Sequence, residues 1–342
     1  MAPPLAELRL GLVGFGKLVR EYYLPALGRL AGTRVVAVAD PLAESRRAAE
    51  RRLHDAAIFT EHRAMLERGA IDALLVASPP ATHLDVWSDA LARGLPAFVE
   101  KPLLLSGQLP HLALVEAPRV MVDFNRRFWP TYRQVRDLVQ RGVLGSPVDL
   151  DFVLQLDVDR WCSVTRHRLD AQQGGLLHDL GCHAIDLALD VIGEEPKRVV
   201  ALTSSQRWPD DQVRLRLDFP SGSSATCQLG YGDRTRERLV VRGPAKTARL
   251  AEPNTVLQVD AAGARRNPLG AWALNAASLG YRGLRRSQSM GQASIREALA
   301  AFVHSLRTGS PCAPGFADGL RNARWVGAAM RSAAAGGRAQ TP

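Results

Sequence analysis

The stretch LRLGLVGFG, residues 8–16, decides the fold, because an apolar run leads directly into glycine, one other residue and a second glycine. The helical spacing of residues 17–30 then predicts a strand–turn–helix unit. Gly14 permits a tight turn, and Gly16 lets the backbone approach a pyrophosphate where free helix N–H groups attract anions. Val19 occupies the place of the usual third glycine. The predicted dinucleotide-binding loop consists of Gly14, Phe15, Gly16, Lys17 and Leu18.

The next predicted strand, RVVAVA at 34–39, ends in an acidic residue, Asp40. A carboxylate at this strand end accepts hydrogen bonds from the adenosine ribose hydroxyls and repels a 2′-phosphate. NAD(H) is therefore favoured as cofactor, although Arg46 and Arg47 on the following helix leave NADP(H) open. The alternative interpretation is an ordinary turn with a capping aspartate.

Further apolar strands are expected at 72–77, 97–99 and 119–122, with helices between them. Apolar strands that alternate with helices predict a parallel sheet covered on both faces, and thus an α/β Rossmann domain over residues 1–122. Polar groups follow two of these strands, at the edge where open parallel sheets bind ligands. The candidate cofactor contacts there are Ser78, Pro79, Pro80, His83, Glu100 and Lys101.

Lys101 is the strongest chemical candidate among them. Only four lysines occur among 44 basic residues, and a lysine, unlike an arginine, can give or share a proton. The alternative is a salt-bridged surface lysine. His83 alone is equally compatible with a histidine at the start of a helix.

After Asp123 the pattern changes. A helix at 131–141, a strand at 148–157 and a series of strands with short turns over 198–259 predict an α+β domain with a mostly antiparallel open sheet. This domain, residues 123–342, is expected to carry substrate binding and oligomerisation, and its C-terminal helices can pack back on the first domain.

The segment GGLLHDLGCHAID, residues 174–186, is the second chemical candidate. On a regular helix Asp179, His183 and Asp186 stand at i, i+4 and i+7, which places them on one face. A carboxylate raises the pKa of a nearby histidine toward the range of a general acid–base. The alternatives are a solvated polar face and a metal site; no metal is predicted, because three ligands on one helix cannot surround an ion.

The formal net charge of +10 raises the possibility of nucleic-acid binding. The arginines are scattered through amphipathic helices, so a solvated basic surface is the preferred interpretation, and no nucleic-acid partner is expected. The four cysteines form no CxxC pair. With no signal peptide and no apolar run of about 18 residues, we expect a cytoplasmic protein without a membrane partner.

Together, Gly14-Phe15-Gly16, Glu100-Lys101-Pro102 and the pattern G-G-x-x-x-D-x-G-x-H-x-x-D at 174–186 resemble the Gfo/Idh/MocA oxidoreductase family. The resemblance extends from about Leu8 to Arg331. It implies an NAD(H)-dependent oxidoreductase that acts on a secondary alcohol or ketone of a sugar, cyclitol or nucleotide-linked sugar. It also implies a homodimer or homotetramer.

The family resemblance assigns roles to individual residues. Lys101 would contact the reacting hydroxyl, and Asp179 and His183 would be the substrate-binding acid and the general base. The further substrate contacts it implies are Arg127, Trp161 and Asp186. Two alternatives stay open within the same fold: a glycosidase that keeps NAD bound, and a non-catalytic NAD-binding regulator. The short segment 103–118, which contains two prolines, departs from the family pattern and predicts an irregular helix.

Overall fold

The computed structural model describes residues 7–112, 117, 119–157, 159, 175–251, 256–262 and 290–342. The chain forms two compact units. The first contains residues 1–125 and 289–323, and the second contains residues 126–288 and 324–342. The first unit thus includes a segment from near the C-terminus, with helix α10 (Met290–Thr308).

The first unit is built on a six-stranded parallel sheet in the order β3-β2-β1-β4-β5-β6. The strand order reverses beside β1, and ligands bind at the carboxyl ends of the strands at such a point. The strands are β1 (Leu8–Val13), β2 (Thr33–Ala39), β3 (Ala57–Phe59), β4 (Ala73–Val76), β5 (Ala97–Val99) and β6 (Val120–Val122).

Helices cover both faces of this sheet, which confirms the sequence prediction. On one face Trp87 of α4 packs edge-on against Phe316 of α11, with ring centroids 5.5 Å apart. On the other, Phe98 of β5 contacts both Tyr23 and Phe302 of α10. The helical elements along this part of the chain are a π-helical turn η1 (Val19–Tyr23), α1 (Leu24–Leu27), α2 (Ala43–Glu50), α3 (His62–Arg68), η2 (Pro80–Thr82), α4 (His83–Leu91), η3 (Ser106–His111), η4 (Asn125–Phe128), α10 and α11 (Phe316–Ala334).

Helix α11 belongs to both units, because the division falls after Ala323. The segment that precedes it pairs with the edge of the parallel sheet, where Val122 N–H donates to Pro314 O at 3.0 Å. In the short segment after Pro102, the described helical structure is the 3-10 helix η3. The prediction of an irregular helix there is confirmed.

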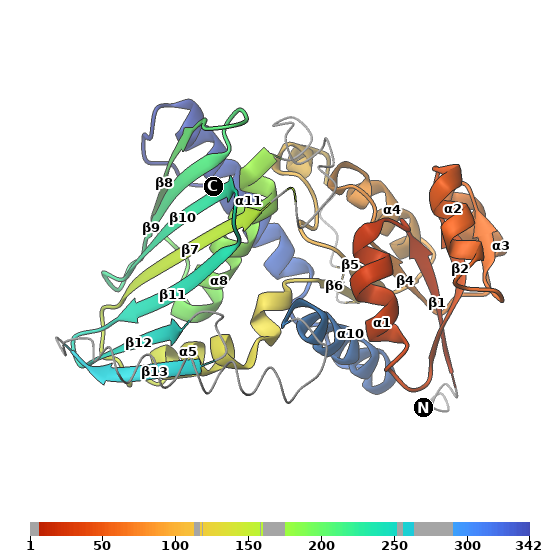
Figure 1. Ribbon diagram of the computed structural model, residues 1–342, viewed down its shortest axis with the longest axis horizontal. Coiled ribbons are helices and arrows are strands. Elements are labelled where there is room, and N and C mark those ends of the chain that lie inside the picture. The colour runs from red at the N-terminus through yellow and green to blue at the C-terminus, as the bar shows by residue number, and fades with distance from the viewer. Residues whose placement is uncertain are drawn as a thin grey trace. The chain divides into compact units, whose positions relative to one another are not determined.

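The second unit contains a seven-stranded sheet in the order β13-β12-β11-β7-β10-β9-β8 (Figure 1). All neighbouring pairs are antiparallel except β10 and β7, so the predicted mostly antiparallel sheet is confirmed. The strands are β7 (Asp149–Asp157), β8 (Arg198–Ser204), β9 (Gln212–Asp218), β10 (Ser224–Gly232), β11 (Arg236–Arg242), β12 (Lys246–Ala251) and β13 (Val256–Ala261).

Helices pack on one face of this sheet and bury its apolar side chains. They are α5 (Pro130–Gln140), the π-helical turn η5 (Leu177–Gly181), α8 (Cys182–Ile192) and the second part of α11. Along β9 the side chains alternate, since Val213, Leu215 and Leu217 are buried whereas Arg214 and Arg216 are exposed. The other face of the sheet is therefore polar at this strand.

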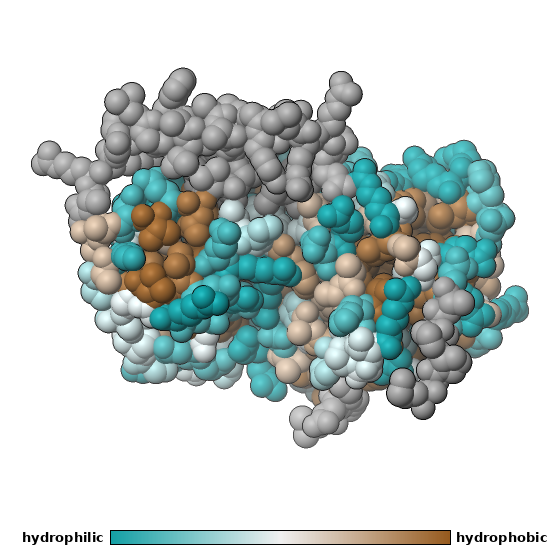
Figure 2. All heavy atoms as spheres, turned by 90° about the horizontal axis from the view of Figure 1, so that it is seen from below, coloured by the Kyte–Doolittle hydropathy of each residue, from teal (hydrophilic) through white to brown (hydrophobic). Residues whose placement is uncertain are grey.

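Figure 2 shows hydrophilic side chains over much of the face in view, with smaller hydrophobic areas. Three large hydrophobic side chains are strongly exposed among the described residues, namely Leu42, Leu202 and Val259. Within the described part of the chain, no helix combines the length and apolar character that crossing a membrane requires.

Candidate functional site

The turn after β1 requires glycine at its first position. Gly14 has a φ of +89°, which side chains rarely tolerate, and a Cβ there would lie 2.7 Å from the carbonyl oxygen of Ala77. Its N–H donates to Ala39 O at 2.9 Å. The turn is thus held tightly between the ends of β2 and β4.

Gly16 is different, because neither its backbone conformation nor a contact with the described residues requires a glycine there. A Cβ added to Gly16 would meet no atom within 4 Å among the described residues, and its φ is ordinary. The helical backbone of residues 17–27 begins directly after it and widens into a π-helical turn at Val19. Open space beside the N–H groups of a helix start fits a pyrophosphate that approaches the backbone closely.

Asp40 connects this loop to the end of β2. Its Oδ2 accepts the N–H of Phe15 at 2.7 Å, and its Oδ1 accepts the N–H of Leu42 at 2.8 Å. Each carboxylate oxygen keeps a second lone pair, so hydrogen bonds from a ribose remain possible. The Arg46 guanidinium lies at the same strand end, because it donates to the carbonyls of Asp40 and Pro41.

The segment after β4 is fixed by His83, which is fully buried. Its Nδ1 lies 2.7 Å from Pro102 O, and its Nε2 lies 2.8 Å from Ser78 O. Both contacts have hydrogen-bond length, so both ring nitrogens are engaged by backbone carbonyls. His83 therefore links the loop of Ser78, Pro79 and Pro80 to the loop that follows Lys101, which gives it a positioning role.

Glu100 and Lys101 stand at the carboxyl end of β5. The N–H of Glu100 donates to Val76 O at 2.8 Å, and its buried carboxylate accepts the Tyr23 hydroxyl at 2.7 Å and the N–H of Lys101 at 3.1 Å. The first unit thus brings most of the predicted cofactor residues to one sheet edge, at the ends of β1, β2, β4 and β5.

In the second unit, Asp179 and His183 lie on consecutive helical turns of different kinds. Asp179 is part of the π-helical turn η5, and His183 is in the first turn of α8 and nearly buried. The spacing of the motif predicts one regular α-helix. The structure instead has a π-helical turn followed by an α-helix, so that prediction is wrong in this respect. Tyr231 of β10 donates its hydroxyl to Asp179 Oδ2 at 2.9 Å.

Tyr231 is a residue that the sequence analysis missed. It points to the helix-covered face of the sheet, the same face as Leu229, and is 3% exposed. A buried tyrosine hydroxyl usually has a hydrogen-bond partner, so an inward tyrosine on a strand was the available signal.

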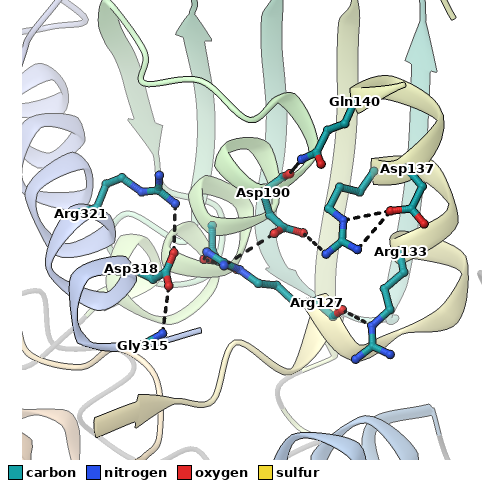
Figure 3. Close-up of polar contacts among 10 residues, drawn as sticks. Arg127, Arg133, Asp137, Gln140, Asp190, Gly315, Asp318 and Arg321 are labelled. Atoms are coloured by element: carbon teal, nitrogen blue, oxygen red, sulfur yellow. Dashed lines mark hydrogen bonds and ion pairs between the residues drawn. The ribbon is translucent and has the colours of Figure 1, made fainter. Parts of the chain in front are cut away.

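Arg127 and Asp186 pair with each other. The Arg127 Nη2 lies 2.6 Å from Asp186 Oδ1, its Nε donates to Oδ2 at 3.0 Å, and the Asp186 side chain is 3% exposed. Asp190 lies 3.6 Å from Arg127 and extends the pair to Arg136 (Figure 3). Asp186 is thus committed to an ion pair that joins η4 to α8.

Lys17 and Leu18 begin the helical segment that follows the glycine turn. The Lys17 Nζ lies 4.0 Å from Glu21, one turn along its helix, and Leu18 follows it in the first helical turn. Trp161 and Gly174 lie outside the described residues. Among the residues that the structure describes, no group of three histidine, cysteine or acidic side chains could hold a metal ion.

Comparison with known proteins agrees with this geometry. Residues 8–116 match the model of the oxidoreductase family with an NAD-binding Rossmann fold, and residues 132–249 match the Gfo/Idh/MocA C-terminal domain. The rhizopine catabolism protein MocA of Rhizobium meliloti is 32% identical over 238 residues, which cover 66% of this chain and 72% of MocA. The chain belongs to the Gfo/Idh/MocA family. It is therefore an oxidoreductase with an NAD-binding domain, and the resemblance seen in the sequence is confirmed.

Two other relatives span almost the whole chain. Inositol 2-dehydrogenase of Rhizobium meliloti (strain 1021) is 27% identical over 96% of this chain and 97% of its own. The structure of scyllo-inositol dehydrogenase from Lactobacillus casei with bound NAD(H) and scyllo-inositol has a TM-score of 0.75 at 20% identity, and covers 95% of this chain and 96% of its own. At this identity the structural likeness shows the shared fold.

Proposed function

We propose that this Gfo/Idh/MocA protein oxidises a secondary alcohol of a sugar or cyclitol with NAD⁺, or catalyses the reverse reduction. One observation carries the proposal: the first unit presents Lys101 at the same sheet edge as the glycine turn, and the second unit holds Asp179 and His183 on adjacent helical turns. The inositol dehydrogenases among its relatives support a polyhydroxylated substrate.

NAD⁺, when bound, supplies the hydride acceptor. His183 takes the proton of the reacting hydroxyl, and the charge of Lys101 stabilises the developing alkoxide. Asp179, oriented by Tyr231, accepts hydrogen bonds from neighbouring substrate hydroxyls. The ion pair of Arg127 and Asp186 fixes α8 and so holds His183 in place.

The residues that hold the cofactor are those of the sheet edge in the first unit. The proposed contacts are the loop Gly14–Leu18, Asp40 at the ribose, the segment Ser78–Pro80, and Glu100 with Lys101. The Asp40 carboxylate beside the ribose supports a preference for NAD(H).

As the assembly we propose a cytoplasmic homodimer or homotetramer. The homo-oligomer is supported by a sheet that carries helices on only one of its faces among the described residues, and by the exposed Leu202 on β8.

The two glycines of the turn should separate folding from cofactor binding. In Gly16→Ala the added Cβ finds open space, so we expect an unchanged melting temperature and NADH affinity reduced at least about tenfold, because the methyl group occupies the pyrophosphate position. In Gly14→Ala the positive φ and the 2.7 Å contact should lower stability by about 1–3 kcal/mol. Thermal unfolding and NADH fluorescence titration measure both. Normal NADH affinity in Gly16→Ala would contradict the assigned phosphate position.

The proposed function is tested by a panel of cyclitols and aldoses, each assayed with NAD⁺ and with NADP⁺ for formation of reduced nicotinamide. We expect turnover on at least one polyol, with NAD⁺ giving the higher kcat/KM. A higher value with NADP⁺ would overturn the role of Asp40 and point to Arg46. Cleavage of a glycoside without net NADH formation would indicate the glycosidase, and tight NADH binding without any turnover would indicate the regulator.

A further inference from the structure

Three acidic groups meet inside the first unit. Glu100 follows β5, Asp123 follows β6, and Tyr23 ends the π-helical turn η1. The Tyr23 hydroxyl oxygen lies 2.7 Å from Glu100 Oε1 and 2.9 Å from Asp123 Oδ2. Tyr23 is 0% exposed, Glu100 8% and Asp123 1%. The phenol thus bridges two buried carboxyl groups.

This bridge needs two protons. The phenol has only one, and it can lie in only one of the two short oxygen–oxygen contacts. If both carboxyls were ionised, the second contact would bring two oxygen lone pairs together with no proton between them. One carboxyl group must therefore be protonated.

The surroundings identify Asp123 as the protonated group. Glu100 has two donors, the Tyr23 hydroxyl and the backbone N–H of Lys101. The Asp123 Oδ1, by contrast, is buried and accepts no hydrogen bond from an N–H or O–H group among the described residues, and the other side chain with which Asp123 interacts directly is the Glu100 carboxyl. An ionised Asp123 would be a buried charge with at most one donor, which is strongly unfavourable.

The pKa directions agree with this arrangement. Burial raises the pKa of Asp123 well above its usual range, and the charge of Glu100 adds to the rise. Burial also raises the pKa of Glu100, but the positive charge of Lys101 and the hydrogen bond from Tyr23 oppose it. Burial and the two carboxyls raise the pKa of Tyr23, so the phenol keeps its proton.

We propose that Asp123 is a neutral carboxylic acid, and that the chain Asp123–Tyr23–Glu100 is a positioning device that keeps a single negative charge next to Lys101. Asp123 donates to the Tyr23 oxygen, and the Tyr23 hydroxyl donates to Glu100. The single negative charge of Glu100 neutralises the positive charge of Lys101 and favours its protonated form. Two ionised carboxylates in this space would leave a net negative charge beside the lysine. The importance of Lys101 rests on the proposed function, but the protonation of Asp123 does not.

The first test compares the wild type with Asp123→Asn, which introduces a neutral side chain of the same shape. A carboxyl whose pKa is raised by folding binds its proton more tightly in the folded state, so stability falls as pH rises above about 4, the value in the unfolded chain. The amide of the variant does not titrate. Urea midpoints of both proteins are measured at pH 5, 6, 7 and 8. The midpoint of Asp123→Asn should therefore rise progressively relative to that of the wild type as pH increases. A stability difference between the two proteins that stays constant from pH 5 to pH 8 would show that Asp123 is ionised in the folded protein across this range, and would overturn the proposal.

The second test reads the charge at Lys101 without any substrate. Competitive acetylation across pH, followed by peptide mass spectrometry, gives the pKa of each lysine, with Lys17, Lys197 and Lys246 as internal references. Glu100→Gln removes the negative charge and should lower the pKa of Lys101, whereas Asp123→Asn should leave it unchanged below pH 8. An equal fall in both variants would contradict a single charge on Glu100.

A measurement on the wild type covers the case in which a variant does not fold. Infrared spectroscopy at pH 7 should show the C=O stretch of a protonated carboxylic acid, which shifts in heavy water. Its absence would overturn the proposal. None of the three measurements requires turnover of a substrate, so their results remain valid if the protein turns over no tested polyol. Failure of this proposal can therefore be distinguished from failure of the proposed function.

Discussion

Replacing Lys101 by methionine should lower turnover by about a hundredfold to a thousandfold while NADH affinity changes little. The methionine keeps the length and apolar stem of the side chain but removes the charge that faces the developing alkoxide, and such electrostatic stabilisation is typically worth this much. The effect should appear in kcat and in kcat/KM alike, because the charge acts on the transition state.

Lys197 provides the matched control, because it is an exposed lysine before β8. Lys197→Met should keep the kinetic constants of the wild type. Steady-state kinetics on the best polyol, together with NADH titration, measure both variants. If Lys101→Met turned over as fast as Lys197→Met, the lysine would have no part in the chemistry.

Replacing Asp186 by alanine should destabilise the protein by about 3–5 kcal/mol, because Arg127 would remain as a largely buried charge without its main partner. Asp190, at 3.6 Å, can compensate only in part. Urea unfolding of the wild type and the variant measures the difference. The double variant Arg127→Met with Asp186→Leu should recover much of the loss, because it removes both charges together.

An exposed ion pair of the same sheet domain is the control for this experiment. Arg198 lies 2.7 Å from Asp218, with its side chain 59% exposed, so Arg198→Met should cost less than about 1 kcal/mol. A loss of this small size in Asp186→Ala would contradict the structural role of the ion pair. A stable Asp186→Ala variant with a raised KM would instead return Asp186 to the substrate contacts.

The sequence was sufficient to predict the parallel sheet, because its central strands are continuous apolar runs that end in glycine, aspartate, serine or glutamate. It failed to predict β3 and α3, because the strand Ala57–Phe59 is three residues long and only partly buried. The two π-helical turns were also missed. Such turns alter the backbone hydrogen bonding without leaving a periodic pattern in the residues.

For the candidate site too, the sequence predicts some features and not others. The glycines and charged residues at strand ends could be predicted to gather at one sheet edge, because the strand direction alone brings them together. The partners of these residues could not be predicted, since they are far apart in the chain. Tyr23 and Asp123 are 100 residues apart, and Arg127 and Asp186 are 59 residues apart. Only the three-dimensional structure shows that Asp186 faces an arginine.

Hydride transfer from a carbinol carbon to NAD⁺ is the chemistry on which the proposed function depends, and isotope transfer tests it most directly. The protein is incubated with NAD⁺ and a polyol substrate deuterated on its carbon atoms, and the nicotinamide product is analysed by mass spectrometry. We expect reduced cofactor that carries one deuterium on the nicotinamide ring, and formation of the corresponding ketone. Reduced cofactor without deuterium, or a converted substrate without any reduced cofactor, would contradict hydride transfer.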